Sequence, residues 1–339
     1  MKGSDKQKIK VDMNIKRTLL NTLAEAGGRF VSGAAIAEKL GVSRNAVWKT
    51  VKALEADGYI IESITSKGYR LSEASNRLSA DLITPLLDTK KLGCEIQVFD
   101  EIDSTNNYAK ILTSQGSPHG TVIISDRQTE GRGRMGRNFV SPSGTGIYMS
   151  LILRPEYGLD CAPLMTSAAA CGVAEAIEEM CGSRVMIKWV NDIYIRGKKI
   201  SGILTEASLG LEMKILDFAV IGIGINVRSV KGKFDDELSQ IASSIEDETG
   251  AILDRNVLCA KILNKLEKYL DMVESKAFLD EYRSRELLTG NVITSNVGGE
   301  ILKGIAMGID DNANLIMKLP NGQLKKLGSG EANLTRITE

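Results

Sequence analysis

The sequence predicts an α/β multi-domain chain (α+β) with three parts: a basic helical module, a mixed sheet with helices on one side, and a small β-barrel. Three observations support this fold class. The chain has 339 residues, too many for one typical hydrophobic core. Apolar residues have helical spacing over 15–57, whereas later apolar runs are mostly short and alternating. Residues 1–75 carry 13 Lys and Arg but 8 Asp and Glu, so this module is basic although the whole chain has zero net charge.

The composition is typical of a globular protein in a reducing compartment. Hydrophobic residues make up 43% of the chain and charged residues 25%, as in ordinary soluble domains. Apolar runs stay well short of the ~20 residues of a membrane span, and residues 1–14 lack the apolar core of a signal peptide. The five cysteines form no CxxC pair, which predicts reduced core thiols and a cytoplasmic location. The single histidine, His119, argues against a Cys/His zinc site or a Ser-His-Asp triad.

Residues 1–75 are predicted to form a winged helix-turn-helix DNA-binding domain. Two helices between residues 15 and 40 precede a third over 44–57, and a hairpin over 59–71 forms the wing. Basic and polar residues on the third helix and the wing suit base edges and phosphates. The predicted DNA-binding residues are Ser43, Arg44, Asn45, Trp48, Lys49, Lys52, Lys67 and Arg70. The alternative is a helical bundle with a solvated basic face, in which Trp48 packs on the hairpin.

A linker over 76–92 is expected to lead into a central domain over 93–285. Its apolar runs predict strands at 95–99, 121–125 and 147–153, and helical segments at 162–180 and 255–283 are expected to cover the sheet. Residues 286–339 contain short alternating runs separated by Gly-Gly, Asp-Asp-Asn and Pro-Asn-Gly turns. This last pattern predicts a small antiparallel β-barrel.

A loop rich in glycine and arginine stands between two of the predicted strands. Its sequence is Gly131-Arg132-Gly133-Arg134-Met135-Gly136-Arg137. Glycines let successive backbone N–H groups approach an anion, and arginine offers a planar fork for phosphate or carboxylate. The loop is therefore predicted to close over a negatively charged ligand. Taken alone this is a weak signal, because a surface loop or a nucleic-acid patch has the same composition.

Two further features predict a ligand on the sheet. Lys188 lies in an otherwise apolar run and Asp192 follows at a turn, a pair suited to phosphate and Mg²⁺ but also to a structural ion pair. Glycines at 202, 222 and 224 interrupt apolar strands. Strand positions without a side chain indicate that a flat ligand approaches the backbone, although close helix packing would also explain these glycines.

Five motifs occur in an order that carries a family resemblance. They are DSTN at 103–106, QTEGRGRMGRNFVSPSGTGIYMSL at 128–151, KWVNDIY at 188–194, KKISGIL at 198–204 and GIGIN at 222–226. Together they resemble the biotin protein ligases, and the N-terminal winged helix makes the resemblance one to the bifunctional ligases that also repress the biotin operon. The match covers essentially the whole chain. Two departures are Val190, where the family often has Pro, and Phe139, where it often has Trp.

The resemblance implies roles for individual residues. Biotin contacts are implied for Ser104, Thr105, Asn106, Gln128, Arg132, Gly133, Arg134, Lys199, Gly202, Gly222 and Gly224. Nucleotide contacts are implied for Arg134, Arg137, Phe139, Lys188, Asn191 and Asn226. The residues expected to carry the chemistry are Arg132, Arg134, Lys188 and Asp192, with Asp192 also holding Mg²⁺.

The implied activity has two half-reactions. Biotin and Mg-ATP form biotinyl-5′-AMP, and the biotinyl group then passes to a lysine of the biotin carboxyl carrier protein of acetyl-CoA carboxylase or another biotin-dependent carboxylase. The adenylate-bound homodimer is expected to repress transcription by binding a two-fold operator DNA, with no membrane involved, and the C-terminal barrel is expected to be Src-homology-3-like. Two alternatives are a non-enzymatic biotin sensor and a lipoate or other acyl-adenylating ligase.

Overall fold

The computed structural model describes residues 3–72, 76–155, 161–209, 216–297, 299–328 and 330–334. The chain forms two compact units, Met1–Leu86 with Asp254–Val257, and Leu87–Leu253 with Leu258–Glu339. Among the described residues, no helix combines the length and the apolar character that crossing a bilayer requires.

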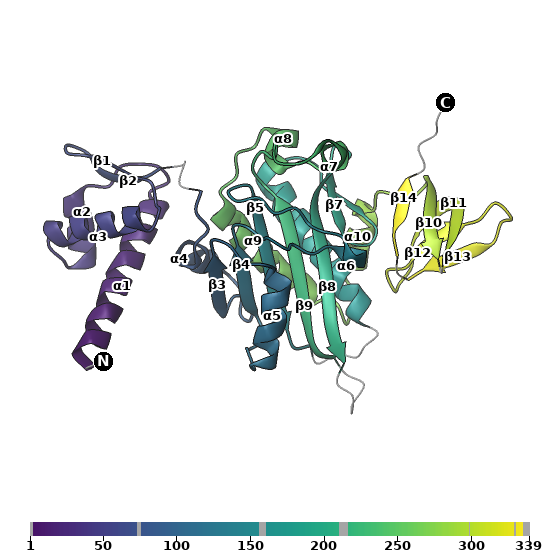
Figure 1. Ribbon diagram of the computed structural model, residues 1–339, viewed down its shortest axis with the longest axis horizontal. Helices are drawn as coiled ribbons and strands as arrows, with labels where there is room; N and C mark the ends of the chain where they lie inside the picture. Colours follow the sequence, from purple (N-terminus) through teal and green to yellow (C-terminus); the bar gives the residue numbers. More distant parts are fainter. Residues whose placement is uncertain are drawn as a thin grey trace. The chain divides into compact units, whose positions relative to one another are not determined.

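The first unit contains the predicted helix-turn-helix and wing (Figure 1). A shared apolar core holds the helices together through Leu19, Leu20, Leu23, Ile36, Val47, Val51 and Leu54. Ser43 caps the third helix by accepting a hydrogen bond from the backbone N–H of Ala46. Its elements are α1 (Gly3–Glu25), α2 (Gly33–Leu40), α3 (Arg44–Ala56), β1 (Ile61–Ile64), β2 (Gly68–Leu71), α4 (Ala80–Ile83) and the 3₁₀ turn η1 (Thr84–Leu86).

The first helix is longer than its apolar spacing predicts. α1 begins at Gly3 rather than near residue 15, because the polar segment before residue 15 is rich in Lys and other residues with good helix propensity. Gly68 opens strand β2 with φ 101°, and a side chain there would lie 2.0 Å from the carbonyl oxygen of Val31. Glycine is therefore required where the wing packs on the chain segment before α2.

A seven-stranded mixed sheet is the centre of the second unit. Its order is β3-β4-β5-β9-β8-β7-β6, with β3 and β4 parallel and the other neighbours antiparallel. The strands are β3 (Glu95–Phe99), β4 (Thr121–Ser125), β5 (Gly146–Leu153), β6 (Met186–Lys188), β7 (Asp192–Ile195), β8 (Lys198–Leu209) and β9 (Leu216–Asn226). The apolar run at 185–195 is thus a tight hairpin, and Asp192, predicted at a turn, begins its second strand.

Helices cover both faces of this sheet, so the prediction of helices on one side is wrong. Helix α5 (Thr105–Ser114) packs Ala109 and Leu112 against Ile152 and Val220 on one face. Helix α6 (Ala162–Cys181) lies on the other, where the Thr166 hydroxyl bonds that of Thr205 at 2.8 Å. Alternation along a strand shows which residues share a face, but not which helix covers that face.

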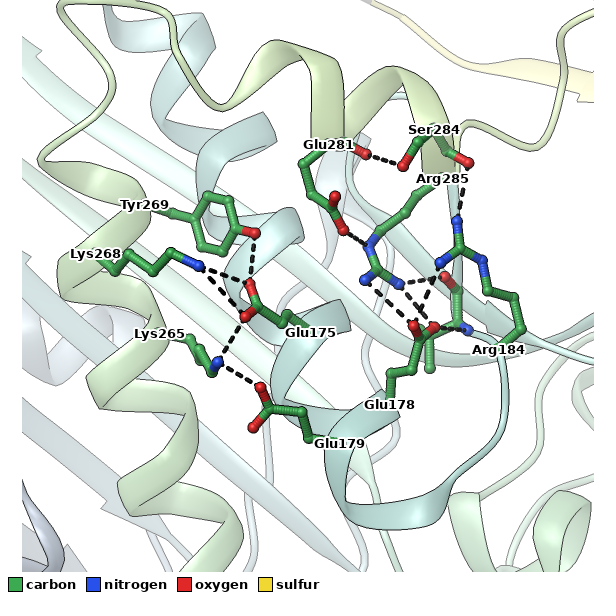
Figure 2. Close-up of polar contacts among 11 residues, drawn as sticks. Glu175, Glu178, Glu179, Arg184, Lys265, Lys268, Tyr269, Glu281, Ser284 and Arg285 are labelled. Atoms are coloured by element: carbon green, nitrogen blue, oxygen red, sulfur yellow. Dashed lines mark hydrogen bonds and ion pairs between the residues drawn. The ribbon is translucent and has the colours of Figure 1, made fainter.

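A charged network fastens the helices of the α6 face together, as Figure 2 shows. Glu175 on α6 accepts hydrogen bonds from Lys265 at 2.6 Å and from the hydroxyl of Tyr269 at 2.5 Å, both on α9 (Arg255–Leu270). Glu178 pairs at 2.8 Å with Arg285, which lies on α10 (Leu279–Arg285). Burial alone would raise the pKa of the Glu175 carboxyl, but the bonds from Lys265, Tyr269 and Lys268 lower it to about 2.

The C-terminal strands form an antiparallel sheet with the order β13-β12-β11-β10-β14. A closed barrel is not confirmed, because closure needs hydrogen bonds between the first and last strands, and the ladders among the described residues end at β13 and β14. The strands are β10 (Val292–Val297), β11 (Glu300–Ile309), β12 (Leu315–Lys318), β13 (Leu324–Leu327) and β14 (Ala332–Leu334).

All five cysteines are free thiols, as predicted, but only two belong to the core. Cys171 and Cys259 are buried, Cys161 and Cys181 are half-buried, and Cys94 is exposed. Burial raises the pKa of the Cys171 thiol, so this cysteine stays protonated and acts as a small apolar side chain.

Candidate active site

A cavity of about 620 Å³ opens on the α5 face of the central sheet. It brings together the residues that the family resemblance assigned to biotin, nucleotide and metal, although they come from five separate motifs. The cavity is lined by Ser104, Thr105, Asn106, Gln128, Arg132, Gly133, Arg134, Arg137, Phe139, Lys188, Asn191, Asp192, Lys199, Gly202, Gly222, Gly224 and Asn226. Helix α7 (Asp236–Ile241) adds Leu238 and Ile241 to its rim.

The three strand glycines form the floor of this cavity. Gly202 pairs directly with Gly224 across β8 and β9, and Gly222 pairs with Leu204. A Cβ at Gly224 would lie 2.6 Å from the ring of Phe139, and one at Gly222 would lie 2.1 Å from the Oδ1 of Asn106. The backbone there is bare because polar and aromatic side chains of the site rest on it. At Gly202 and Gly224 the nearest side chains come from strand and loop residues, whereas Asn106 at Gly222 lies in the first turn of α5, so close helix packing contributes at that position.

One end of the cavity holds a network of neutral hydrogen-bonding groups. The Oε1 of Gln128 accepts from the Thr105 backbone N–H at 2.9 Å and lies 3.1 Å from its hydroxyl. Ser150 is fully buried, and its Oγ lies 2.8 Å from Thr105 Oγ1 and 2.5 Å from Asn106 Oδ1. Ser104 caps α5 by accepting from the backbone N–H of Asn107. Ser104 therefore both caps the helix and lines the cavity.

Two residues of this network were missed by the sequence reasoning. Ser150 stands in the largely apolar strand segment 147–153, and Glu206 follows the KKISGIL motif within β8, on the same strand face as Gly202. Glu206 accepts a hydrogen bond from Asn106 at 2.9 Å and one from Lys110 at 3.0 Å. For both residues, the available signal was a polar side chain on the strand face that carries the glycines.

The Gly/Arg loop is held at the cavity by its three arginines. Arg132 donates to Asn107 at 2.9 Å, and Arg134 donates to Asn191 at 2.8 Å and to the Gly330 carbonyl oxygen at 3.0 Å. Arg137 forms a two-bond pair with Glu331, and this pair raises the pKa of the guanidinium. In this structure the three arginines bind groups of the protein itself, and the loop residues form part of the cavity lining.

The opposite end of the cavity is cationic. Lys188 and Asp192 are cross-strand neighbours in the β6–β7 hairpin, yet Asp192 pairs with Lys199 at 2.7 Å, whereas Lys188 donates to Asn333 at 2.7 Å. Desolvation lowers the pKa of the Lys188 ammonium, and the charge of Asp192 opposes that shift. The structural ion pair considered for Lys188 and Asp192 is therefore formed with Lys199 instead.

A Mg²⁺ ion would have to find most of its ligands outside the protein. Within the described residues no group of three or more His, Cys, Asp or Glu could hold a metal. Mg²⁺ in nucleotide sites is commonly held by one or two carboxylates together with phosphate oxygens and water. The half-buried carboxylate of Asp192 could supply one such ligand in place of its pairing with Lys199.

Of the eight residues predicted to bind DNA, Ser43 caps α3, and the other seven fall into two groups. Arg44, Asn45 and Lys49 are exposed on α3, and Trp48 is 49% exposed between them. Lys52, Lys67 and Arg70 already have partners: Lys52 pairs with Glu55, Arg70 with Glu62, and both Lys67 and Arg70 lie over the Phe30 ring. The first group is an exposed basic surface. In the second, Lys52 is paired within α3, whereas Lys67 and Arg70 stabilise the wing.

Comparison with known proteins agrees with the DNA-binding module and with the ligand-binding cavity. The model of the biotin/lipoate A/B protein ligase family matches residues 98–226, and an HTH domain model matches residues 16–70. The bifunctional ligase/repressor BirA of Bacillus subtilis (strain 168) is 37% identical over 323 residues, which cover 94% of this chain and 98% of the relative. The bifunctional ligase/repressor BirA of Escherichia coli (strain K12) is 31% identical over 91% of this chain and 94% of that protein.

A solved structure has the same fold. The biotin protein ligase from Aquifex aeolicus in complex with biotin and ATP matches with a TM-score of 0.61 at 29% identity, over 72% of this chain and 99% of that chain. The similarity to the bifunctional relatives extends over both the DNA-binding module and the glycine-floored cavity. The chain therefore belongs to the family of bifunctional biotin ligase/repressors.

Proposed function

We propose that this chain ligates biotin to a carrier protein through an enzyme-bound adenylate, and represses transcription when that adenylate is bound. One observation carries the proposal. A single cavity has a neutral hydrogen-bonding end at Thr105 and Gln128, a cationic end at Lys188 and Lys199, and a glycine floor between them. That arrangement suits a neutral ureido ring at one end and phosphates at the other.

The first half-reaction requires positioning more than proton transfer. The biotin carboxylate is already ionised at pH 7, so it attacks the α-phosphate of ATP without a general base. Arg132, Arg134 and Lys188 are proposed to hold the carboxylate and phosphate oxygens in line. When bound through Asp192, Mg²⁺ would supply further neutralisation of phosphate charge. Phe139, lying on Gly224, is proposed to cover the adenylate face with less area than a Trp would.

In the second half-reaction a lysine of the carrier protein attacks the acyl carbon of the adenylate. The new amide bond forms as the bond to the phosphate oxygen breaks, and AMP leaves. The lysine must lose a proton, and we propose Asp192 as its acceptor. A closed loop at 131–137 would protect the mixed anhydride from water until the carrier arrives.

For the repressor activity we propose that the adenylate promotes a homodimer that binds a two-fold operator DNA. A dimer presents two recognition helices to two half-sites. Exposed Arg44, Asn45 and Lys49 are proposed to make the main DNA contacts. We expect Lys49→Ala to weaken binding similarly for all operator sequences. In gel-shift titrations, the slope of the logarithm of the binding constant against the logarithm of the salt concentration should fall by about 1, while ligation stays unchanged. An unchanged slope would remove Lys49 from the interface.

We further propose a DNA-binding domain over 1–75, a linker over 76–92, a catalytic domain over 93–285 and a C-terminal domain over 286–339. The last of these is proposed to be a Src-homology-3-like barrel built on the antiparallel sheet β10–β14. A cytoplasmic location is proposed as well, because the free thiols, the operator and the carrier protein all suit that compartment.

The decisive test uses the full chain with labelled biotin, ATP, Mg²⁺ and a biotin carboxyl carrier domain. We expect label on the acceptor lysine, and biotinyl-5′-AMP on the enzyme when the carrier is omitted. Adenylate binding without transfer would support a non-enzymatic biotin sensor. Preferred transfer of lipoate in a competition would support a different acyl-adenylating ligase.

A further inference from the structure

Glu206 is an acidic residue within a strand that otherwise supports a ligand-binding face. It lies on β8 opposite Val220, two strand positions beyond Leu204, and its side chain is 25% exposed. A carboxylate that is partly removed from water must be compensated by hydrogen bonds or by opposite charge. Its partners therefore indicate what this residue does.

Three partners meet at the Glu206 carboxylate. Its Oε2 accepts from the Asn106 amide at 2.9 Å, and its Oε1 accepts from the Lys110 ammonium at 3.0 Å and lies 3.5 Å from the Arg132 guanidinium. Asn106 and Lys110 are four residues apart on α5, and so share one face of that helix. Glu206 consequently joins the sheet, the start of α5 and the Gly/Arg loop at one point.

Charge and hydrogen bonding keep this carboxyl group ionised. Burial alone would raise the pKa of the Glu206 carboxyl. The bonds from Asn106 and Lys110, and the charges of Lys110 and Arg132, outweigh burial and lower the pKa below its ordinary value. A fixed negative charge therefore faces the loop arginine at neutral pH.

Arg132 is held differently from the other two loop arginines. Its Nη1 donates to Asn107 at 2.9 Å and lies 3.5 Å from Glu206, so both partners belong to the central domain. Arg134 donates both to Asn191 and to the Gly330 carbonyl oxygen, and Arg137 pairs with Glu331, so these two arginines also contact the segment before β14. Because a guanidinium carries five N–H donors, one terminal nitrogen can hold Arg132 in place while the others face the cavity that this residue lines.

We propose that Glu206 is a positioning residue that fixes Arg132, and with it the closed form of the 131–137 loop, over the bound acyl group. It does so by accepting from Asn106, which rests on the Gly222 floor, and by attracting Arg132 from the loop. Glu206 touches no reacting atom in this account. The inference rests on the proposed ligase activity and deepens it, because it names the side chain that controls retention of the adenylate.

The test measures dissociation of preformed biotinyl-5′-AMP from the full chain after a chase with unlabelled biotin. We expect Glu206→Gln to release the adenylate about threefold to tenfold faster and to raise the KM for biotin by a similar factor, with a smaller change in kcat, since contacting groups at a partly exposed site couple modestly. In an Arg132→Met background, Glu206→Gln should add no further acceleration. Arg132→Met removes the same contact from the side of the exposed loop. If Glu206→Gln fails to fold, adenylate release from Arg132→Met therefore tests the proposal.

Two controls separate positioning from general stability. Lys110→Met removes the other cation at Glu206 without touching the loop, and should accelerate release less than Glu206→Gln. Glu101→Gln breaks the exposed ion pair with Arg127 outside the cavity, and should leave release unchanged. Release at the wild-type rate in Glu206→Gln, additive effects in the double variant, or an equal effect of Lys110→Met would overturn the inference. Failure of the wild-type chain to form any adenylate would instead overturn the proposed ligase activity.

Discussion

The two faces of the central sheet use similar residues for opposite purposes. On the α6 face, Glu175 and Glu178 are paired with cations from α9 and α10, and small residues allow close helix packing. On the α5 face, glycines leave the backbone bare, and the cations Lys188 and Lys199 line a cavity. The first face pairs its carboxylates with cations of the protein. On the second, Lys199 pairs with Asp192 and Lys188 donates to the neutral amide of Asn333, which we propose leaves the Lys188 charge for a negatively charged ligand.

Glycine shows the same contrast. A Cβ at Gly172 on α6 would lie 3.2 Å from the backbone nitrogen of Leu266, whereas one at Gly222 would lie 2.1 Å from a side-chain oxygen of Asn106. The first glycine permits two helices to approach, and the second permits a polar side chain to rest on a strand. A glycine in the sequence therefore does not by itself show whether the position serves packing or binding. The group that contacts the glycine in the fold shows which it is.

The largest effect is expected at the cationic end of the cavity. Lys188→Met removes an ammonium that we place on the phosphates, and should slow adenylate formation about 10²- to 10³-fold in single-turnover assays. The matched change on the other face is Lys265→Met, which should leave that rate within about twofold because the Lys265 ammonium bonds Glu175 and Glu179, away from the cavity. A rate in Lys188→Met close to that of the wild type would contradict the contrast between the faces.

A second comparison uses the two glycines. Gly222→Ala should displace Asn106 from the floor, and we expect the KM for biotin to rise about tenfold to a hundredfold, since small misplacements in a site are costly. Gly172→Ala should instead lower the melting temperature by forcing α6 and α9 apart, with the KM for biotin unchanged. Equal effects of both substitutions on the KM would show that Gly222 acts through stability.

The charged network predicts a pH-dependent stability effect. The pKa of Glu175 is about 2 in the folded chain and ordinarily 4.5. Since the folded value is the lower one, its stabilisation is complete above pH 4.5 and is lost as the pH falls towards 2. Glu175→Gln should therefore reduce the free energy of unfolding by on the order of 2 kcal/mol at pH 7 and by much less near pH 2.5. Denaturant titrations at the two pH values test this, and an equal loss at both would exclude the electrostatic cause.

The smallest effect is expected from Phe139. Its ring rests on Gly224 and meets Tyr148 edge-on, with centroids 6.3 Å apart. Phe139→Trp should improve adenylate retention by about twofold to threefold because of its larger aromatic area, and Phe139→Leu should weaken it. Equal retention of the adenylate by the two variants, measured by chase, would contradict this role.

Local patterns predicted much of the fold and the cavity. Strands at 121–125 and near 147–153, the capped helices of the first unit and the bare glycines all follow from short-range spacing. Contacts between residues far apart in the sequence do not follow from such spacing. Glu206 meets Asn106 across 100 residues, and Lys188 meets Asn333 across 145. Such contacts depend on strand order and on how the C-terminal sheet packs within the second unit, which alternation and motif spacing do not encode.

The most direct test of the account compares biotin-dependent pyrophosphate release in three chains: the wild type, Lys188→Met and Glu175→Gln. The wild type and Glu175→Gln should release pyrophosphate at similar rates at pH 7, because the α6 face only stabilises the fold. Lys188→Met should be slower by about 10²-fold or more. Equal rates in all three chains, or a loss in Glu175→Gln as large as that in Lys188→Met, would contradict the assignment of the chemistry to the α5 face.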